Sequence, residues 1–264
     1  DEGIRFATAL HAADEPSLPI SRVRDQGLWW ADDQMVPVEQ ASLVQRQPLP
    51  VASPGRTDQE QRNRAAFAAL KSDGSVVAWG DPDSGGDLSR AAERLNGDVV
   101  QIFSSAGAFT ALKADGSIVS WGDSGSGGVI PPSLLADLDE AVVRLASNDF
   151  AFAAVTETGA VVSWGDASNG GYSRAFEDQL SRGVVEVFAS QSAFAALKQD
   201  GSVVTWGRDS AGGDSSAVSD ELSSGVVEIV STDSAFAALN DDGSVVSWGN
   251  PAAGGNSTPV AEQL

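Results

Sequence analysis

A fifteen-residue stretch ending in Trp-Gly occurs five times in this chain, and it limits the possible folds more than any other feature. The copy at 193–207 reads AFAALKQDGSVVTWG. A Gly-Gly pair follows each copy a few residues later. A regular period of this length indicates an architecture in which each repeat forms one small structural unit. The tryptophans of the five copies are 42, 43, 42 and 42 residues apart, at Trp79, Trp121, Trp164, Trp206 and Trp248.

Each repeat contains three predicted strands. In the fourth copy, the β-branched run VVEVF at 184–188 predicts the first strand and AFAALK at 193–198 predicts the second. Asp200-Gly201 predicts a tight hairpin turn, because glycine adopts a positive φ without a Cβ clash. Residues 202–206 then predict the returning third strand. The third copy keeps only the glycine of this turn, in Thr158-Gly159.

A short helical turn is predicted between each Gly-Gly pair and the next repeat, because apolar residues four positions apart lie on one face of a helix. A unit of three short strands and one or two helical turns is marginal alone, so neighbouring units must complete its core. The sequence therefore predicts a propeller or a solenoid. The five apolar pairs are Ala91 and Leu95, Leu134 and Leu138, Phe176 and Leu180, Val218 and Leu222, and Val260 and Leu264.

Residues 1–64 are interpreted as a degenerate first repeat. The start, DEGIRFA, resembles a first strand, and VRDQGLWWAD at 23–32 resembles a later hairpin shortened by two residues. MVPVEQAS from Met35 resembles GVVEVFAS, the first strand of a following repeat, and 43–64 is then an inserted loop rich in Pro, Gln and Arg. With five regular repeats over 65–264, we expect a single domain of six units over 1–264. The two ends fall at the same point of a repeat, which favours a closed propeller.

The motif ALKSDGSVVAWGD, followed by Gly-Gly, is similar to the repeats of the regulator of chromosome condensation (RCC1). DGSVVAWGD together with the later TPVAEQL resembles still more the bacterial β-lactamase-inhibitory type of the same superfamily. The resemblance covers 65–264 well and 1–64 weakly. It implies an all-β fold, an RCC1-like β-propeller whose blades radiate from a central axis. Both families usually have seven blades, and the six units found here leave the count open between six and seven.

The residues behind the functions of these families are mostly replaced in this chain. The resemblance to the chromosome-condensation family implies nucleotide exchange on a small GTPase and nucleosome binding. The histidine common in its repeats is replaced at Ala66, Ala108, Ala151, Ala193 and Ala235. The resemblance to the inhibitor family implies aromatic side chains in the loop before the second strand. The matching positions are Gly107, Phe150, Ser192 and Ser234, of which one is aromatic.

The chain is strongly acidic, with 16 basic and 37 acidic residues and a formal net charge of −21. Phosphate binding needs clustered Lys and Arg, so neither nucleic acid nor an anionic membrane surface is an expected partner. We interpret the charge as a solvated exterior. No apolar run reaches the ~20 residues of a membrane helix, and membrane insertion is not expected. The absence of cysteine excludes disulfides, but it is compatible with either an extracellular or a reducing compartment. The location stays open, with an extracellular or otherwise exported one slightly favoured.

No catalytic or metal centre is predicted. Asp81, Asp83 and Asp87 alternate as at the start of a calcium loop, but the other copies lose most of these ligands, and a Gly-rich turn is the favoured interpretation. His11 is the only histidine, and it lies outside any pattern typical of a Ser-His-Asp triad. The repeated tryptophans are expected to pack in the core. We expect no enzyme activity and no cofactor.

The sequence predicts a non-enzymatic protein-binding or assembly module with a protein partner. The degenerate first unit and the arginine-containing stretch 45–64 break the symmetry of the repeats, so the partner is expected there. Adjacent tryptophans on a strand point to opposite faces, so one of Trp29 and Trp30 is expected to be exposed. The alternative is that both belong to a locally repacked core of a degenerate blade. The candidate contacts are Trp29, Trp30, Arg46, Arg56, Arg62, Arg64 and Phe150. Two alternatives stay open: a secreted proteinaceous inhibitor of an extracellular enzyme, and a structural repeat segment of a larger surface or complex protein.

Overall fold

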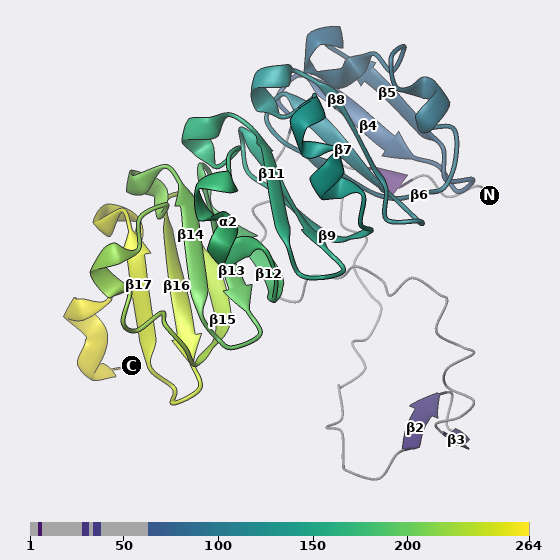
Figure 1. The fold of residues 1–264 in the computed structure, drawn as a ribbon. Coiled ribbons are helices and arrows are strands. Elements are labelled where there is room, and N and C mark those ends of the chain that lie inside the picture. The colour runs from purple at the N-terminus through teal and green to yellow at the C-terminus, as the bar shows by residue number, and fades with distance from the viewer. Residues whose placement is uncertain (1–4, 7–27, 32–33, 38–62, 264) are drawn as a thin grey trace. The chain divides into compact units, whose positions relative to one another are not determined.

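The computed structural model describes residues 5–6, 28–31, 34–37 and 63–263. Five antiparallel three-stranded sheets make up most of this part of the chain, and we number them 1 to 5 in chain order (Figure 1). Their strands are β1 (Arg5–Phe6), β4 (Ala66–Leu70) and β5 (Val76–Gly80) in sheet 1; β6 (Val99–Ser104), β7 (Ala108–Lys113) and β8 (Ile118–Gly122) in sheet 2; β9 (Val142–Ser147), β10 (Ala151–Thr156) and β11 (Val161–Gly165) in sheet 3; β12 (Val184–Ala189), β13 (Ala193–Lys198) and β14 (Val203–Gly207) in sheet 4; and β15 (Val226–Ser231), β16 (Ala235–Asn240) and β17 (Val245–Gly249) in sheet 5.

The predicted hairpins connect the second and third strands of each sheet. Gly201 has φ +77°, and the carboxylate of Asp200 accepts the Ser202 N–H at 3.0 Å and the Ser202 hydroxyl at 2.6 Å. An Asp side chain that bonds its own backbone two residues later fixes such a turn. The Asp-Gly-Ser sequence therefore sets the register, in which Phe194 lies opposite Trp206.

Short helical turns follow the third strands, as the apolar spacing predicts. The second apolar residue of the pair is buried in three of them, at Leu95, Leu180 and Leu222. None of the helices in the described part of the chain has the length and hydropathy needed to cross a membrane. The turns nearest the next repeat are Ala92–Arg94, Pro132–Leu134, Ala136–Leu138, Arg174–Phe176, α2 (Glu177–Leu180), Ser216–Val218 and Thr258–Gln263. The turns directly after the third strands are Pro82–Gly86, Ser124–Ser126, Ala167–Asn169, Asp209–Ala211 and Pro251–Ala253.

The core lies between consecutive sheets, at contacts that we call joints. Successive side chains of a strand point to opposite faces, so AFAAL places its first two alanines on one face, and phenylalanine and the third alanine on the other. At the joint between sheets 3 and 4, Ala151 and Ala153 of β10 pack in one apolar cluster with Phe194 and Trp206. The two aromatic rings are 5.4 Å apart. Small side chains on one sheet thus make room for large ones on the next.

The Gly-Gly pair completes each joint. Gly170 has φ +98°, and an added Cβ there would lie 2.6 Å from Phe194 Cδ2. An added Cβ at Gly171 would lie 2.4 Å from the carbonyl carbon of Gly165. The indole Nε1 of Trp206 donates to the Gly170 carbonyl at 2.9 Å. The same bond joins Trp121 to Gly85, Trp164 to Gly127 and Trp248 to Gly212, at 3.0, 3.0 and 3.1 Å.

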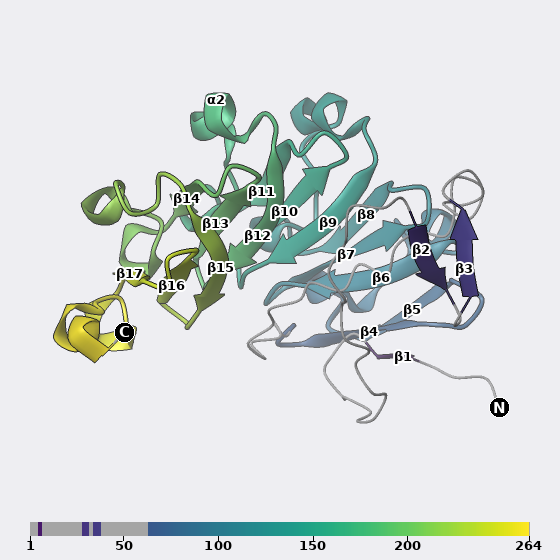
Figure 2. The same cartoon turned by 90° about the horizontal axis from the view of Figure 1, so that it is seen from below.

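The first strands of sheets 2 to 5 follow one another in contact, β6 with β9, β9 with β12 and β12 with β15 (Figure 2). Sheets packed face to face with their first strands together form the blade arrangement of a β-propeller. The expected all-β, propeller-type fold with three strands and a helical turn per repeat is therefore confirmed for the five regular repeats. The count of six units stays a prediction.

The start of the chain pairs differently from the expectation. β1 pairs with β4 and supplies the first strand of sheet 1, whereas the likeness of MVPVEQAS to GVVEVFAS predicts that role for the segment from Met35. That prediction is wrong: β2 (Leu28–Ala31) and β3 (Gln34–Pro37) pair with each other instead. Only two residues separate them, so this local pairing closes a very short loop at little entropic cost.

The chain divides into two compact units, Asp1–Ala9 with Ser53–Leu264, and Leu10–Ala52. The β2–β3 hairpin belongs to the second unit and the five sheets belong to the first. The inserted loop 43–64 lies outside the described residues except for its last two positions. The single propeller domain over 1–264, with its degenerate first repeat, therefore stays a prediction.

Candidate protein-binding rim

The three residues that directly precede the second strand of each sheet form one candidate surface, which we call the rim, and we call each group of three a loop. The residues of the rim are 63–65, 105–107, 148–150, 190–192 and 232–234. The first residue of each loop is a polar clamp. Asn148 is fully buried; its Oδ1 accepts the N–H groups of Phe150 and Ala151, both at 2.8 Å, and its Nδ2 donates to the Asn169 carbonyl at 2.7 Å. One side chain thus ties the loop to the turn after the third strand.

The other four loops repeat this clamp with different residue types. The Ser105 and Ser190 hydroxyls donate to the carbonyls of Ser126 and Ala211, at 2.7 and 2.8 Å. Asn63 and Thr232 make the corresponding bonds to Ser84 and Ala253, at 2.7 and 2.9 Å. Sequence reasoning missed these residues, although they keep the period of 42 or 43. Asn, Ser and Thr all bond nearby backbone, and their shared chemistry was the available signal.

A chain of backbone hydrogen bonds links the second residues of the five loops. Each of the first four loops donates an N–H to the carbonyl of the next loop along. The four links are Arg64 to Ala106 at 2.9 Å, Ala106 to Asp149 at 2.9 Å, Asp149 to Gln191 at 3.2 Å and Gln191 to Asp233 at 2.9 Å. Because clamp and chain both act on the loop backbone, the side chains at the second and third positions are free to vary without moving the loops.

The varied side chains form a polar cluster near the aromatic candidate. Arg64 Nη2 lies 2.7 Å from Asp149 Oδ2, and Gln191 Nε2 donates to the same oxygen at 3.1 Å. The Arg64 side chain is 65% exposed and that of Asp149 is 12% exposed. Phe150 follows Asp149 directly and is half-buried. Side chains from the first, third and fourth loops thus meet at one place on the rim.

The structure places two of the seven predicted contact residues on the rim, Arg64 in the first loop and Phe150 in the third. Trp29 and Trp30 lie on β2, opposite Val36 and Met35 of β3. The three arginines at 46, 56 and 62 lie outside the described residues. The alanines in the family's histidine positions begin the second strands and are buried. Ala66, Ala151 and Ala193 pack in the apolar clusters at the joints.

Two of the three aspartates of the calcium-like stretch, Asp81 and Asp87, accept hydrogen bonds from their own turns. Asp81 Oδ2 accepts the Ser84 N–H at 3.0 Å and the Ser84 hydroxyl at 2.6 Å. Asp87 Oδ1 accepts the Ser89 N–H at 2.8 Å, and this bond lowers the pKa of Asp87. Within the described residues, no three His, Asp or Glu side chains are grouped as metal ligands. Here the carboxylates act as turn and helix caps.

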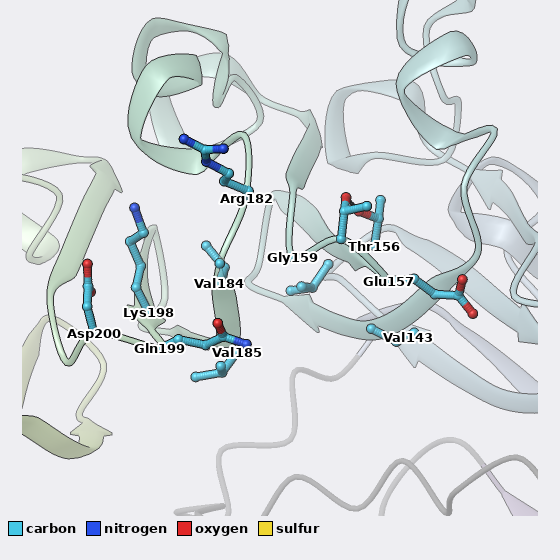
Figure 3. A pocket seen from close by; sticks show the side chains of 13 residues that line it. Val143, Thr156, Glu157, Gly159, Arg182, Val184, Val185, Lys198, Gln199 and Asp200 are labelled. Atoms are coloured by element: carbon cyan, nitrogen blue, oxygen red, sulfur yellow. Dashed lines mark hydrogen bonds between the residues drawn. The ribbon is translucent and has the colours of Figure 1, made fainter. Parts of the chain in front are cut away.

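A groove of about 490 Å³ lies at the hairpin end of the joint between sheets 3 and 4 (Figure 3). Glu157, Arg182, Lys198 and Asp200 are the charged residues in its lining. Figure 3 shows Glu157 on the opposite side of the groove from Lys198 and Asp200. Hydrogen bonds from Ser202, in the same hairpin turn, lower the pKa of Asp200. Charged groups that do not converge on one point do not make a catalytic arrangement.

Neither a protein-family model nor a curated protein sequence matches this chain. Solved structures do match. Prp20p from Saccharomyces cerevisiae, also called yeast RCC1, has a TM-score of 0.47 at 19% identity, with 72% of this chain and 56% of that chain covered. Human WBSCR16 has a TM-score of 0.47 at 19% identity, covering 71% and 60%. The ectodomain of the Arabidopsis thaliana receptor kinase ACR4 has a TM-score of 0.44 at 16% identity, covering 71% and 63%.

The chain thus spans somewhat more than half the length of these structures. They include the yeast member of the RCC1 family, which the repeat motif resembles. At this identity the likeness concerns the fold alone.

Proposed function

We propose that this chain is a non-enzymatic protein-binding module that holds its partner on the rim. The observation that carries this proposal is that some residues of each loop hold its backbone in place while others vary in type. Clamps and backbone bonds hold the loops in the same form, while the pair of residues at the second and third positions changes from loop to loop: Arg-Ala, Ala-Gly, Asp-Phe, Gln-Ser and Asp-Ser. Loops of varied sequence on a rigid scaffold are a common basis of binding sites.

Arg64 and Phe150 are the strongest contact candidates on the rim. Arginine and aromatic residues are enriched among the side chains that dominate interface energies. The guanidinium has five N–H donors, and its Nη2 contact with Asp149 leaves others directed to solvent. A protein partner that presents a carboxylate or carbonyl to Arg64 and an apolar side chain to Phe150 fits this chemistry.

Yeast Prp20p has described binding properties toward Gsp1p and histones, and Kap60 binds it as well. These partners belong to Prp20p, and the support for a protein partner here comes from the rim. The inhibitor and structural-segment hypotheses stay predictions. One aromatic residue among five loops gives the inhibitor hypothesis no specific support.

A comparison of two variants by affinity capture from the native source tests the rim. The double variant Arg64→Gln with Phe150→Ser removes the cationic and aromatic contacts and leaves the clamp Asn148 in place. The matched control is Val227→Ser, which changes an apolar side chain of 55% exposure near the opposite end of β15 from the rim loop. We expect the double variant to lose the wild-type partner while the control retains it.

Thermal unfolding of both variants is measured in parallel, so that loss of capture is separated from loss of folding. A partner that the folded double variant captures as well as the wild type does would overturn the rim as the binding surface.

A further inference from the structure

The residue directly after each Trp-Gly pair lies beside the rim. Its N–H donates to the carbonyl of the third residue of a rim loop, from Asp166 to Phe150 at 3.0 Å and from Arg208 to Ser192 at 2.9 Å. After four of the five sheets, the side chain at this position also caps the turn that follows, by accepting a backbone N–H at 2.7 to 3.1 Å. These four residues are Asp81, Asp123, Asp166 and Asn250.

Arg208 occupies this position after sheet 4, and the turn there has no side-chain cap. Asp and Asn are strongly preferred as caps because they satisfy a backbone N–H at the start of a helical turn. An arginine side chain has no acceptor with which to do so. Folding alone therefore favours Asp or Asn at position 208, and the arginine needs an explanation other than the local turn.

The Arg208 guanidinium is anchored at one of its three nitrogens. Its Nε donates to Asn169 Oδ1 at 3.1 Å, and Asn169 is buried whereas Arg208 is exposed. Among the described residues, Asn169 is the one hydrogen-bond partner of this side chain, and Arg208 forms no ion pair, not even with its neighbour Asp209. The N–H groups on Nη1 and Nη2 are therefore available to a ligand.

Arg208 and Arg64 both connect to the rim loop that carries Phe150. Asn169, the anchor of Arg208, accepts at its backbone carbonyl the hydrogen bond from the clamp of that loop, at 2.7 Å. Arg64 Nη2 lies 2.7 Å from the Asp149 carboxylate of the same loop, which is 12% exposed and accepts a second side-chain donor as well. A ligand at Phe150 thus meets guanidinium groups from two other parts of the chain, whereas the carboxylate beside it is already engaged.

We infer that Arg208 is a further contact residue of the rim and that the partner protein presents a carboxylate to it. This inference rests on the proposed function, the binding of a protein on the rim. A planar guanidinium binds a carboxylate through two parallel N–H groups, and Nη1 and Nη2 of Arg208 provide them. The carboxylate belongs to an acidic segment of a protein that is neutral or basic overall, because a net charge of −21 repels a strongly acidic protein or a nucleic acid.

Arg208→Asp tests the residue, because it restores the cap found after other sheets and reverses the charge. We expect this variant to unfold at a higher temperature than the wild type does. In affinity capture from the native source, it should bind the partner at least about tenfold more weakly. The matched control is Asp123→Asn, which changes the charge at the equivalent position after sheet 2 and keeps a cap of the Asn250 type. The control should capture the partner as the wild type does.

Two results would overturn the inference and leave the proposed function intact. One is undiminished capture by Arg208→Asp under conditions in which the double variant Arg64→Gln with Phe150→Ser loses the partner. The other is a lower unfolding temperature for Arg208→Asp, which would show that the arginine serves the fold. Capture by the folded double variant at the wild-type level would instead refute the proposed function, and the inference with it.

Coupling by a carbodiimide identifies the chemistry of the occupant. Arg208→Lys places an amine at this position, and a carbodiimide joins that amine to a carboxylate in direct contact with it. In the captured complex we expect an amide bond between residue 208 and an Asp or Glu side chain of the partner, located by mass spectrometry. An amide bond to a carboxylate of the same chain, or none in the complex, would overturn the inference, as would loss of the partner after nuclease treatment.

Discussion

The inner joints and the face of sheet 1 that carries Phe67 use the same residue types at the same repeat positions, but differ in how far these residues are buried. Phe194 of sheet 4 is fully buried, whereas Phe67 of sheet 1 is 46% exposed, and the two side chains occupy the same place in their repeats. Within its own sheet, each of the two rings has its centroid 5.4 Å from that of a tryptophan. The difference therefore comes from the neighbouring sheet alone. Each repeat supplies one face to the joint before it and one face to the joint after it. Whether the side chains of a face are buried depends on whether another sheet packs against that face.

This comparison places most of the stability between the sheets. Burying one large apolar side chain contributes about 1.5–3 kcal/mol, and each joint buries a phenylalanine and a tryptophan together. A hydrogen bond such as that from Trp206 Nε1 to the Gly170 carbonyl adds a net ~1 kcal/mol. Effects of substitution should therefore depend on whether a position faces an inner joint.

The largest expected contrast is between Phe194→Ala and Phe67→Ala. Phe194→Ala leaves a cavity at a closed joint and should lower the free energy of unfolding by about 3–5 kcal/mol. Phe67→Ala removes a ring that is already about half exposed to water and should cost less than about 1 kcal/mol. Chemical denaturation followed by tryptophan fluorescence measures both. Equal losses for the two variants would contradict the assignment of stability to the joints.

The glycines give the next contrast. Gly170→Ala strains a backbone at φ +98° and pushes a Cβ against the Phe194 ring; together these should cost about 2–4 kcal/mol. Gly254→Ala carries the same strain at φ +98° with no neighbour to meet, so it should cost about 1–2 kcal/mol. Thermal melts of the two variants measure the difference. A cost at Gly254 equal to that at Gly170 would mean that the Phe194 contact contributes nothing.

The rim clamps should show the same dependence on position, with a smaller effect. Asn148→Ala leaves two buried N–H groups and the Asn169 carbonyl without their partner, at a cost of about 1–3 kcal/mol. Thr232 in sheet 5 holds an exposed loop, where water replaces the lost bonds, so Thr232→Ala should cost less than about 1 kcal/mol. Differential scanning calorimetry compares the two. A larger loss at Thr232 would argue against the clamp as a structural element.

The smallest effects are expected at the hairpins, where position in the stack should not matter. Hydrogen bonds from the Ser75 hydroxyl and N–H lower the pKa of Asp73 to about 2, and the equivalent bonds from Ser202 lower the pKa of Asp200. A folded-state pKa below the unfolded one gives stability that is present above the unfolded pKa and lost as pH falls through the folded pKa. Asp73→Asn and Asp200→Asn should each reduce the acid sensitivity between pH 4 and pH 2 by similar small amounts in pH-dependent melts.

The pKa of Glu186 is shifted in the opposite direction from those of Asp73 and Asp200. Burial raises the pKa of this carboxyl, so its ionisation opposes folding as pH rises through that pKa. Glu186→Gln should therefore improve stability at neutral pH relative to acid pH. A hairpin variant that behaved in the same way as Glu186→Gln would contradict the local hydrogen bonds as the cause.

The repeat motif predicted the architecture because its signals are local. The Asp200-Gly201 turn and the alternation of small and large residues in 193–198 each act within a few residues. Gly170 needed the fold for its explanation, since its Phe194 contact comes from the next repeat. The β1–β4 pairing was missed because it joins segments some sixty residues apart and competes with the local β2–β3 hairpin. The Arg64–Asp149 pair was missed because only stacking of the sheets brings two loops 85 residues apart together.

Proton exchange at the tryptophan indoles, followed by NMR, tests most directly whether neighbouring repeats support one another through the joints. The indole N–H groups of Trp121, Trp164, Trp206 and Trp248 each donate across one joint, at 2.9 to 3.1 Å. We predict that all four exchange as slowly as the core amides of the sheets, and that Phe194→Ala accelerates Trp206 and leaves Trp121 unchanged. The account would be contradicted if all four indole N–H groups exchanged fast while the backbone amides of the sheets stayed protected.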